Sequence, residues 1–106
     1  MNIWDACYEG YVDRVTEVSK QPSFDVNKRN PKGLTPLICS IQGGHIDVVQ
    51  FLLSLRPDVS LKDPEGYSAN EIAVHMDRRD ISSLLDVYII AVYYHCLFCI
   101  FSYYNV

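Results

Sequence analysis

Short apolar segments alternate with turn-forming residues along the middle of the chain. Thr35-Pro36 predicts a helix start, because a threonine hydroxyl accepts from free backbone N–H groups and proline is tolerated at the first helical position. The apolar residues that follow stop at Gly43-Gly44. A second run, residues 46–53, is apolar on nearly every side, as in a helix covered by neighbours, and Pro57 follows it. The pattern predicts two short helices and then a turn-rich loop, residues 58–66.

The same pattern returns after 33 residues. The segment Pro31–Leu37 recurs in weaker form as Pro64–Asn70. Toward the N-terminus, residues 44–49 match residues 10–15 after a shift of 34. Units of this size cannot bury their apolar faces alone, so we expect them to stack on one another.

Two helices, a glycine turn and a loop at this spacing resemble the ankyrin repeat. The matching residues are Gly33-Leu34-Thr35-Pro36-Leu37, Gly44-His45-Ile46-Asp47-Val48-Val49, Leu52-Leu53, Asp25-Val26-Asn27 and Asp58-Val59-Ser60. The resemblance covers about residues 3–86. It implies an all-α solenoid of stacked helix-turn-helix units with short β-hairpin-like loops. The predicted units are residues 2–29, 30–62 and 63–86, and a hydrophobic tail follows at residues 87–106.

The second and third units depart from the family pattern. Ile38 stands where the family usually has histidine, and Ser68-Ala69-Asn70 replaces Thr-Pro-Leu, so we expect weaker hydrogen bonding at these helix starts. Ser82, Ser83 and Asp86 replace mainly apolar residues of the second unit. Because terminal repeats need a polar outer face, the third unit is predicted to cap the array near Asp86.

The resemblance also implies a binding surface, since partners of this family usually lie along the loop tips and the inner helices. It assigns partner contacts to nine positions: Lys28, Arg29, Lys32, Leu34, Gln42, Lys62, Glu65, Tyr67 and His75. Tyr67 is the best candidate anchor, because aromatic residues at a polar rim often dominate binding energy. The positive charges of the first loop favour an acidic peptide, or they are ordinary solvated loop charge.

Composition and charge narrow the class of function. The 106 residues make one small domain at most. Nine basic against thirteen acidic residues give a net charge of −4, which offers no general attraction to nucleic acid. The first residues lack the basic and apolar runs of a secretory signal. We therefore expect a cytoplasmic or nuclear protein whose four cysteines are thiols.

The sequence predicts no catalytic, metal or cofactor site. His45 follows Gly44 at a helix start, which is a common structural position in the family. Cys96 and Cys99 form a CxxC pair, but a zinc site needs about four ligands and no second pair exists. Metalloprotease and serine-hydrolase patterns are also missing. We therefore predict a non-catalytic protein–protein interaction module, an adaptor or scaffold.

The tail leaves alternatives open. Residues 87–104 are eighteen consecutive uncharged residues, about 27 Å long as a helix, close to the hydrocarbon thickness of about 30 Å. One alternative is thus a tail-anchored membrane protein with a cytosolic ankyrin platform, although the many tyrosines and a central His95 oppose spanning. The tail is otherwise an alternative C-terminus of a longer, truncated ankyrin-repeat protein, or a segment that packs on the third unit or on a partner.

Overall fold

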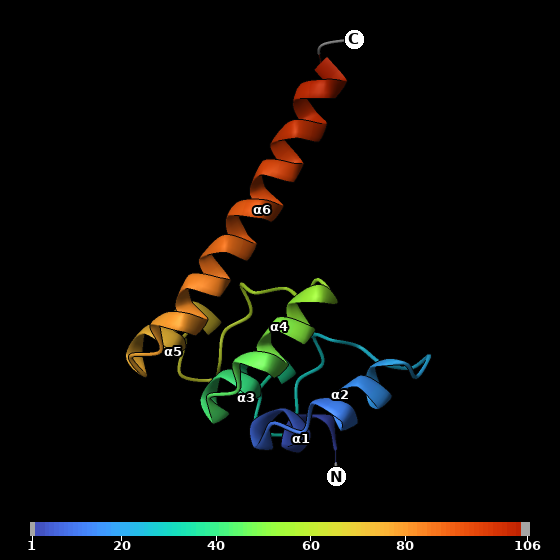
Figure 1. Ribbon diagram of the computed structural model, residues 1–106, viewed down its shortest axis with the longest axis vertical. Coiled ribbons are helices and arrows are strands. Elements are labelled where there is room, and N and C mark those ends of the chain that lie inside the picture. The colour runs from blue at the N-terminus through green and yellow to red at the C-terminus, as the bar shows by residue number, and fades with distance from the viewer. Residues whose placement is uncertain (1, 105–106) are drawn as a thin grey trace.

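The computed structural model describes residues 2–104, with side chains up to residue 92. Within these residues there are six helices: α1 (Ile3–Glu9), α2 (Val12–Ser19), α3 (Pro36–Gly43), α4 (Ile46–Ser54), α5 (Ala69–His75) and α6 (Arg79–Tyr104) (Figure 1). Helix α3 contacts α1 and α5, while α4 contacts α2 and α6. Two rows of helices result, and the predicted all-α solenoid of stacked helix pairs is confirmed.

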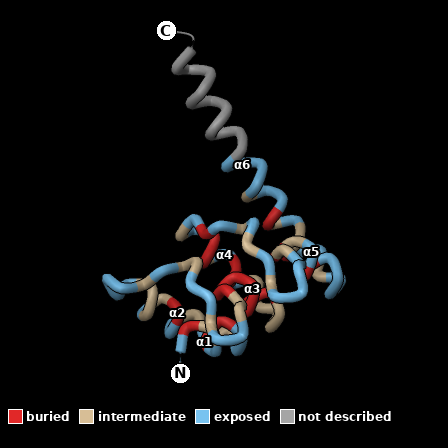
Figure 2. Tube along the Cα trace, turned by 180° about the vertical axis from the view of Figure 1, so that it is seen from behind, coloured by how far each residue is buried: buried red, intermediate tan, exposed pale blue. Residues whose placement is uncertain are grey.

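The hydrophobic core lies between the two rows (Figure 2). Both rows supply fully buried side chains, among them Val15, Ile38, Ile41, Val48, Val49, Leu52, Ile81 and Leu85. Burying a side chain of this size stabilises a fold by about 1.5–3 kcal/mol. The second unit carries most of these residues because it has a neighbour on each side.

A residue with left-handed backbone joins the two helices of each unit. Gly10 (φ 83°), Gly44 (φ 78°) and Asp77 (φ 55°) follow one another at the repeat spacing. Glycine adopts this conformation freely, and aspartate is one of the few other residues that tolerate it. Gly43 is required for a different reason: a Cβ atom there would overlap the carbonyl oxygen of Tyr8, so α1 and α3 approach closely at this point.

The predicted hairpin-like loops are formed by the same turn in two successive units. The side-chain oxygen of Asn30 accepts from the backbone N–H groups two and four residues later, at 3.0 and 2.9 Å. Asp63 does the same at 3.0 and 2.8 Å. Between residues 2 and 104, the β-structure amounts to one isolated antiparallel bridge, Lys62–Ser68.

Hydroxyl groups begin the inner helices of the second and third units. Thr35 Oγ1 accepts from the backbone N–H of Ile38 at 3.3 Å. Ser68 Oγ accepts from the N–H of Glu71 at 3.3 Å, and the Glu71 carboxylate accepts from the N–H of Ser68 at 3.4 Å. This capping box satisfies two otherwise free N–H groups. The expected weakening of the helix start is therefore wrong at Ser68.

Polar side chains of the third unit, which was predicted to cap the array, bond to one another. Asn70 stands at the position of the buried Leu37 in the repeat before it. Its Nδ2 donates to Asp86 Oδ1 at 2.9 Å, and its Oδ1 accepts from Ser82 Oγ at 2.9 Å. Two of the three residues predicted for the polar outer face, Ser82 and Asp86, are therefore linked through Asn70.

Helix α6 continues through the predicted boundary at residue 86. The chain has no glycine or proline after Gly66, so no residue of these types stops the helix there. The Tyr88 hydroxyl donates to the carbonyl oxygen of Pro57 at 3.2 Å, which ties α6 to the loop after α4. Beyond Tyr88, the side chains from Ile89 to Val92 are exposed.

For the tail, the described residues include no helix that combines the length and the apolar character needed to cross a membrane. The side chains of most of the segment 87–104, named above as a possible anchor, lie outside the described residues. The same is true of the Cys96 and Cys99 pair.

Candidate functional site

The row α1, α3 and α5, together with turns 30–34 and 63–67, forms a surface that we call the inner face. Two grooves lie on it. The N-terminal groove has a volume of about 440 Å³ and is lined by Asn2, Trp4, Asp5, Tyr8, Asn30, Pro31, Lys32, Leu34, Cys39 and Gln42. The C-terminal groove, of about 290 Å³, is lined by Tyr67, Asn70, Glu71, Val74 and His75.

Helix α1 supplies an aromatic wall of the N-terminal groove. Trp4 and Tyr8 are one helical turn apart, so they lie on the same side of α1. The Trp4 Nε1–H donates to the Lys28 carbonyl oxygen at 2.9 Å, which fixes the orientation of the indole. Tyr8 is half exposed. Asn2 caps the helix by accepting from the N–H of Asp5 at 2.8 Å, which fixes the backbone between them.

Two buried thiols belong to the helices that form this groove: Cys7 on α1 and Cys39 on α3. Burial and, to a smaller extent, the neighbouring Cys39 raise the pKa of Cys7 to about 12. Burial and, to a smaller extent, the Asp5 carboxylate raise the pKa of Cys39 to about 11, and the Lys32 ammonium opposes this rise. Both cysteines are free thiols, and their neutral form makes them poor nucleophiles at neutral pH. Cys39 lines the N-terminal groove together with Asp5 and Lys32.

The C-terminal groove is built around a pair of rings. The ring centroids of Tyr67 and His75 are 5.6 Å apart, with the planes tilted by 55°. Aromatic rings favour such tilted arrangements at this distance. Tyr67 and Val74 are 37% and 64% exposed, so this groove presents apolar surface to solvent.

The nine predicted partner contacts fall into three groups. Lys32, Leu34 and Gln42 line the N-terminal groove, and Tyr67 and His75 line the C-terminal groove. Four lie near the tips of the turns and line neither groove: Lys28, Arg29, Lys62 and Glu65.

Sequence reasoning missed Trp4, Asp5 and Tyr8. Their signal was an aromatic pair one turn apart on a helix whose core residues, Ile3 and Cys7, lie on another side. Trp4 also packs partly against the core, whereas Tyr8 is half exposed.

Arg29 also has a structural role. Its Nη1 donates to the carbonyl oxygens of Gly33, at 2.7 Å, and Lys62, at 2.6 Å. Nearby, the N–H of Asp58 donates to Asn27 Oδ1 at 2.8 Å. These bonds join the loop regions of the first and second repeats, so Arg29 of the predicted basic patch holds adjacent units together.

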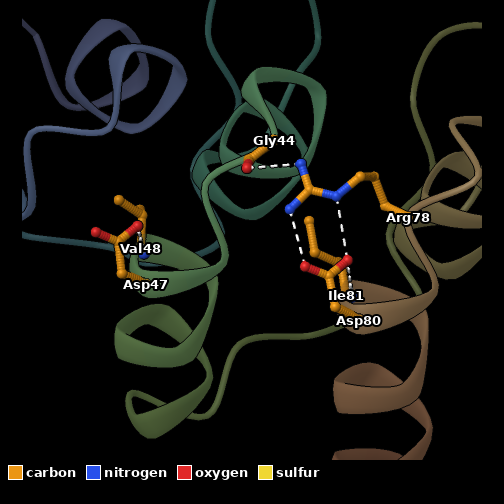
Figure 3. Close-up of polar contacts among 6 residues, drawn as sticks. All are labelled: Gly44, Asp47, Val48, Arg78, Asp80 and Ile81. Atoms are coloured by element: carbon orange, nitrogen blue, oxygen red, sulfur yellow. Dashed lines mark hydrogen bonds and ion pairs between the residues drawn. The ribbon is translucent and has the colours of Figure 1, made fainter.

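Successive units are also joined at the opposite end of the helices. His45 lies against the glycine turn of the preceding unit, since a Cβ atom at Gly10 would be 2.6 Å from its Nδ1. Arg78 occupies the corresponding position one unit later and donates to the Gly44 carbonyl oxygen at 2.8 Å (Figure 3). Its guanidinium pairs with Asp80, lowering the pKa of that carboxyl. The structural interpretation of His45 agrees with this contact.

The described side chains offer no site for metal chemistry. Among them there is no group of three or more His, Cys, Asp or Glu residues placed to hold a metal ion. What these residues do offer is a contact surface of rings, amides and a few charges.

Together, the two rows of stacked helix pairs, the repeated turns and the grooved inner face define a helical repeat protein. The family model described as ankyrin repeats, in three copies, matches residues 3–89. The chain belongs to the ankyrin-repeat family. Ankyrin repeats are generally protein–protein interaction modules, and the family is typically non-catalytic.

Proteins from different organisms are similar to parts of this chain. The Notch-regulated ankyrin repeat-containing protein A of Danio rerio is 36% identical over 58 residues, which cover 55% of this chain and 52% of that protein. The chain thus spans about half the length of this relative. The ankyrin repeat domain-containing protein oryK of Aspergillus oryzae is 33% identical over 80% of this chain, but only 13% of its own length is covered.

A solved structure has the same fold. It is a chain from the complex of the predatory endopeptidase Bd0816 of Bdellovibrio bacteriovorus with the immunity protein Bd3460. The TM-score is 0.76 at 30% sequence identity, and the match covers 81% of this chain and 45% of that chain.

Proposed function

We propose that this chain is a non-catalytic adaptor or scaffold module that binds another protein or peptide through its inner face. The observation that carries the proposal is the pair of grooves on one row of helices, each containing an exposed tyrosine, Tyr8 or Tyr67. Aromatic side chains in such positions supply much of the binding energy of protein interfaces. Family membership supports the same role.

In this proposal each groove has its own aromatic anchor. Tyr67 anchors a partner at the C-terminal groove, and the α1 wall anchors it at the N-terminal groove. The polar residues at the turn tips surround these anchors and provide orientation. A net charge of −4 supports a protein partner over nucleic acid. Buried free thiols at Cys7 and Cys39 fit the proposed cytoplasmic or nuclear location.

Capture of partners by the full chain tests the proposal. Tyr67→Ala and Lys32→Ala each change a groove residue. Tyr11→Ala is the matched control, because Tyr11 is 51% exposed and lines neither inner groove. Loss of an anchor tyrosine costs about 2 kcal/mol, which is about thirtyfold in affinity. We expect Tyr67→Ala to release partners that Tyr11→Ala retains, with circular dichroism confirming that both variants are folded.

Equal retention by Tyr67→Ala, Lys32→Ala and the control would reject the inner face as the binding surface. Loss of every partner with Tyr11→Ala alone would move the interface to the other side of the solenoid.

A further inference from the structure

We propose that the N-terminal groove takes an arginine side chain of the partner, stacked on the α1 wall and paired with Asp5. This inference rests on the proposed function, because it specifies the chemistry of the partner at the same surface. Three features of the groove carry it: the aromatic wall, the free acceptors beside it and the charge of the inner helices.

The aromatic wall is suited to a flat cation. Trp4 and Tyr8 line the groove from one side of α1, and the hydrogen bond from Trp4 to the Lys28 carbonyl oxygen holds the indole in place. A guanidinium group stacks on such rings by cation–π attraction, which is strongest for tryptophan. A ring that is already held in place loses little entropy when a ligand arrives.

Free acceptors stand beside the rings. The Asp5 carboxylate lines the groove one turn before Tyr8, and among residues 2–92 it enters no ion pair or side-chain hydrogen bond as an acceptor. The Gln42 amide lines the same groove, also without a side-chain hydrogen bond within these residues. Arginine has five N–H donors in a planar fork, which suits a carboxylate together with an amide oxygen better than the compact ammonium of lysine.

The charge of the inner helices favours a cationic ligand. Helices α1, α3 and α5 carry Asp5, Glu9 and Glu71, and none of the three helices contains lysine or arginine. Lys32, which also lines the groove, belongs to the first turn instead. Its positive charge repels the guanidinium and so favours a position of that group near the α1 wall. The Lys32 ammonium can then donate to a carbonyl oxygen of the same peptide. Acidic helices with one basic turn thus complement a segment that presents arginine.

Trp4 is the single tryptophan of the chain, so its fluorescence reports on this groove. The probe is a blocked Gly-Arg-Gly tripeptide, titrated into the full chain at constant ionic strength. The matched probe replaces arginine with citrulline, which keeps the shape and removes the charge. We expect saturable emission changes and binding about tenfold tighter for the arginine peptide, as for one charged hydrogen bond lost.

Two variants complete the test. Asp5→Asn should weaken binding of the arginine peptide about tenfold and leave the citrulline peptide unaffected. Asp13→Asn removes the same charge from α2, outside the groove, and should change neither. Equal binding of the two peptides, equal effects of the two variants, or no saturable change with arginine would each overturn the proposal. The peptide titration can fail while Tyr67→Ala still releases the captured partners. That combination would support the proposed function and reject the arginine site.

Discussion

Gly43→Ala tests the close approach of α1 and α3, on which the stacking of the first two units depends. Helix propensity alone predicts a gain of about 1 kcal/mol, because alanine is the better helix former. The new Cβ atom, however, would overlap the Tyr8 carbonyl oxygen, which no change of rotamer can relieve. Overpacking costs about 1–3 kcal/mol, and a backbone obstacle belongs at the upper end. The expected net loss of folding free energy is about 2 kcal/mol.

Gly66→Ala is the control with a different physical cause. Gly66 has φ 92° and open space around its Cα, so alanine there pays only for left-handed backbone, about 1 kcal/mol. Asparagine tolerates this conformation, so Gly66→Asn should recover part of the loss. Asparagine also carries a Cβ atom, so Gly43→Asn should be no better than Gly43→Ala.

Urea unfolding measures these differences, with circular dichroism for the helices and Trp4 fluorescence for the α1 and α3 contact. With a slope of about 1 kcal/mol per molar urea, the Gly43→Ala midpoint should fall by about 2 M without a change in slope. A Gly43→Ala protein that is as stable as the wild type, or more so, would refute the close packing of α1 on α3.

Three further predictions concern polar and titratable groups. A double-mutant cycle of Asn70→Ala and Asp86→Ala should give a coupling of about 0.5–1.5 kcal/mol in urea unfolding, because the two side chains share a hydrogen bond, and zero coupling would contradict the predicted cap. Burial raises the pKa of Cys7 to about 12 and that of Cys39 to about 11, so stability present below pH 9.0 should be lost as pH rises toward these values. In the Cys7→Ala/Cys39→Ala variant, the free energy of unfolding measured with urea should fall less steeply with pH above 9.0. An unchanged slope would show that other groups cause the loss of stability. Arg78 lowers the pKa of Asp80 from 3.8, so the stability from this pair is present above that value and is lost as pH falls. In Asp80→Asn, the urea midpoint should therefore depend less steeply on pH below 3.8.

Local chemistry explains why the repeat architecture could be predicted. Gly44 and Pro36 mark the ends of α3, and their conformational demands depend on few neighbours. The 33-residue period then predicts stacking, because one helix pair leaves its apolar face open. The capping box at Ser68 was also present in the sequence, since Glu71 follows three residues later, but comparison with the family pattern concealed it.

The grooves depend on contacts between units, so the sequence predicted them less well. Tyr67 and Lys32 were found because their positions recur in the repeat. Trp4 and Tyr8 were not, since their exposure follows from how α1 lies on α3. Arg29 was predicted as a partner contact from its position at a loop tip, and its bond to the Lys62 carbonyl oxygen depends on how the second loop folds.

Site-specific photocrosslinking tests the central claim, that the inner face is the binding surface. A photoreactive phenylalanine analogue replaces Tyr8, Tyr67 or Tyr11, one at a time, in the full chain. Tyr8 and Tyr67 line the two grooves, whereas Tyr11 is at least as exposed as either but lines neither. We predict that a captured partner crosslinks from positions 8 and 67 and not from position 11. Crosslinks from position 11 with none from the grooves would contradict the claim.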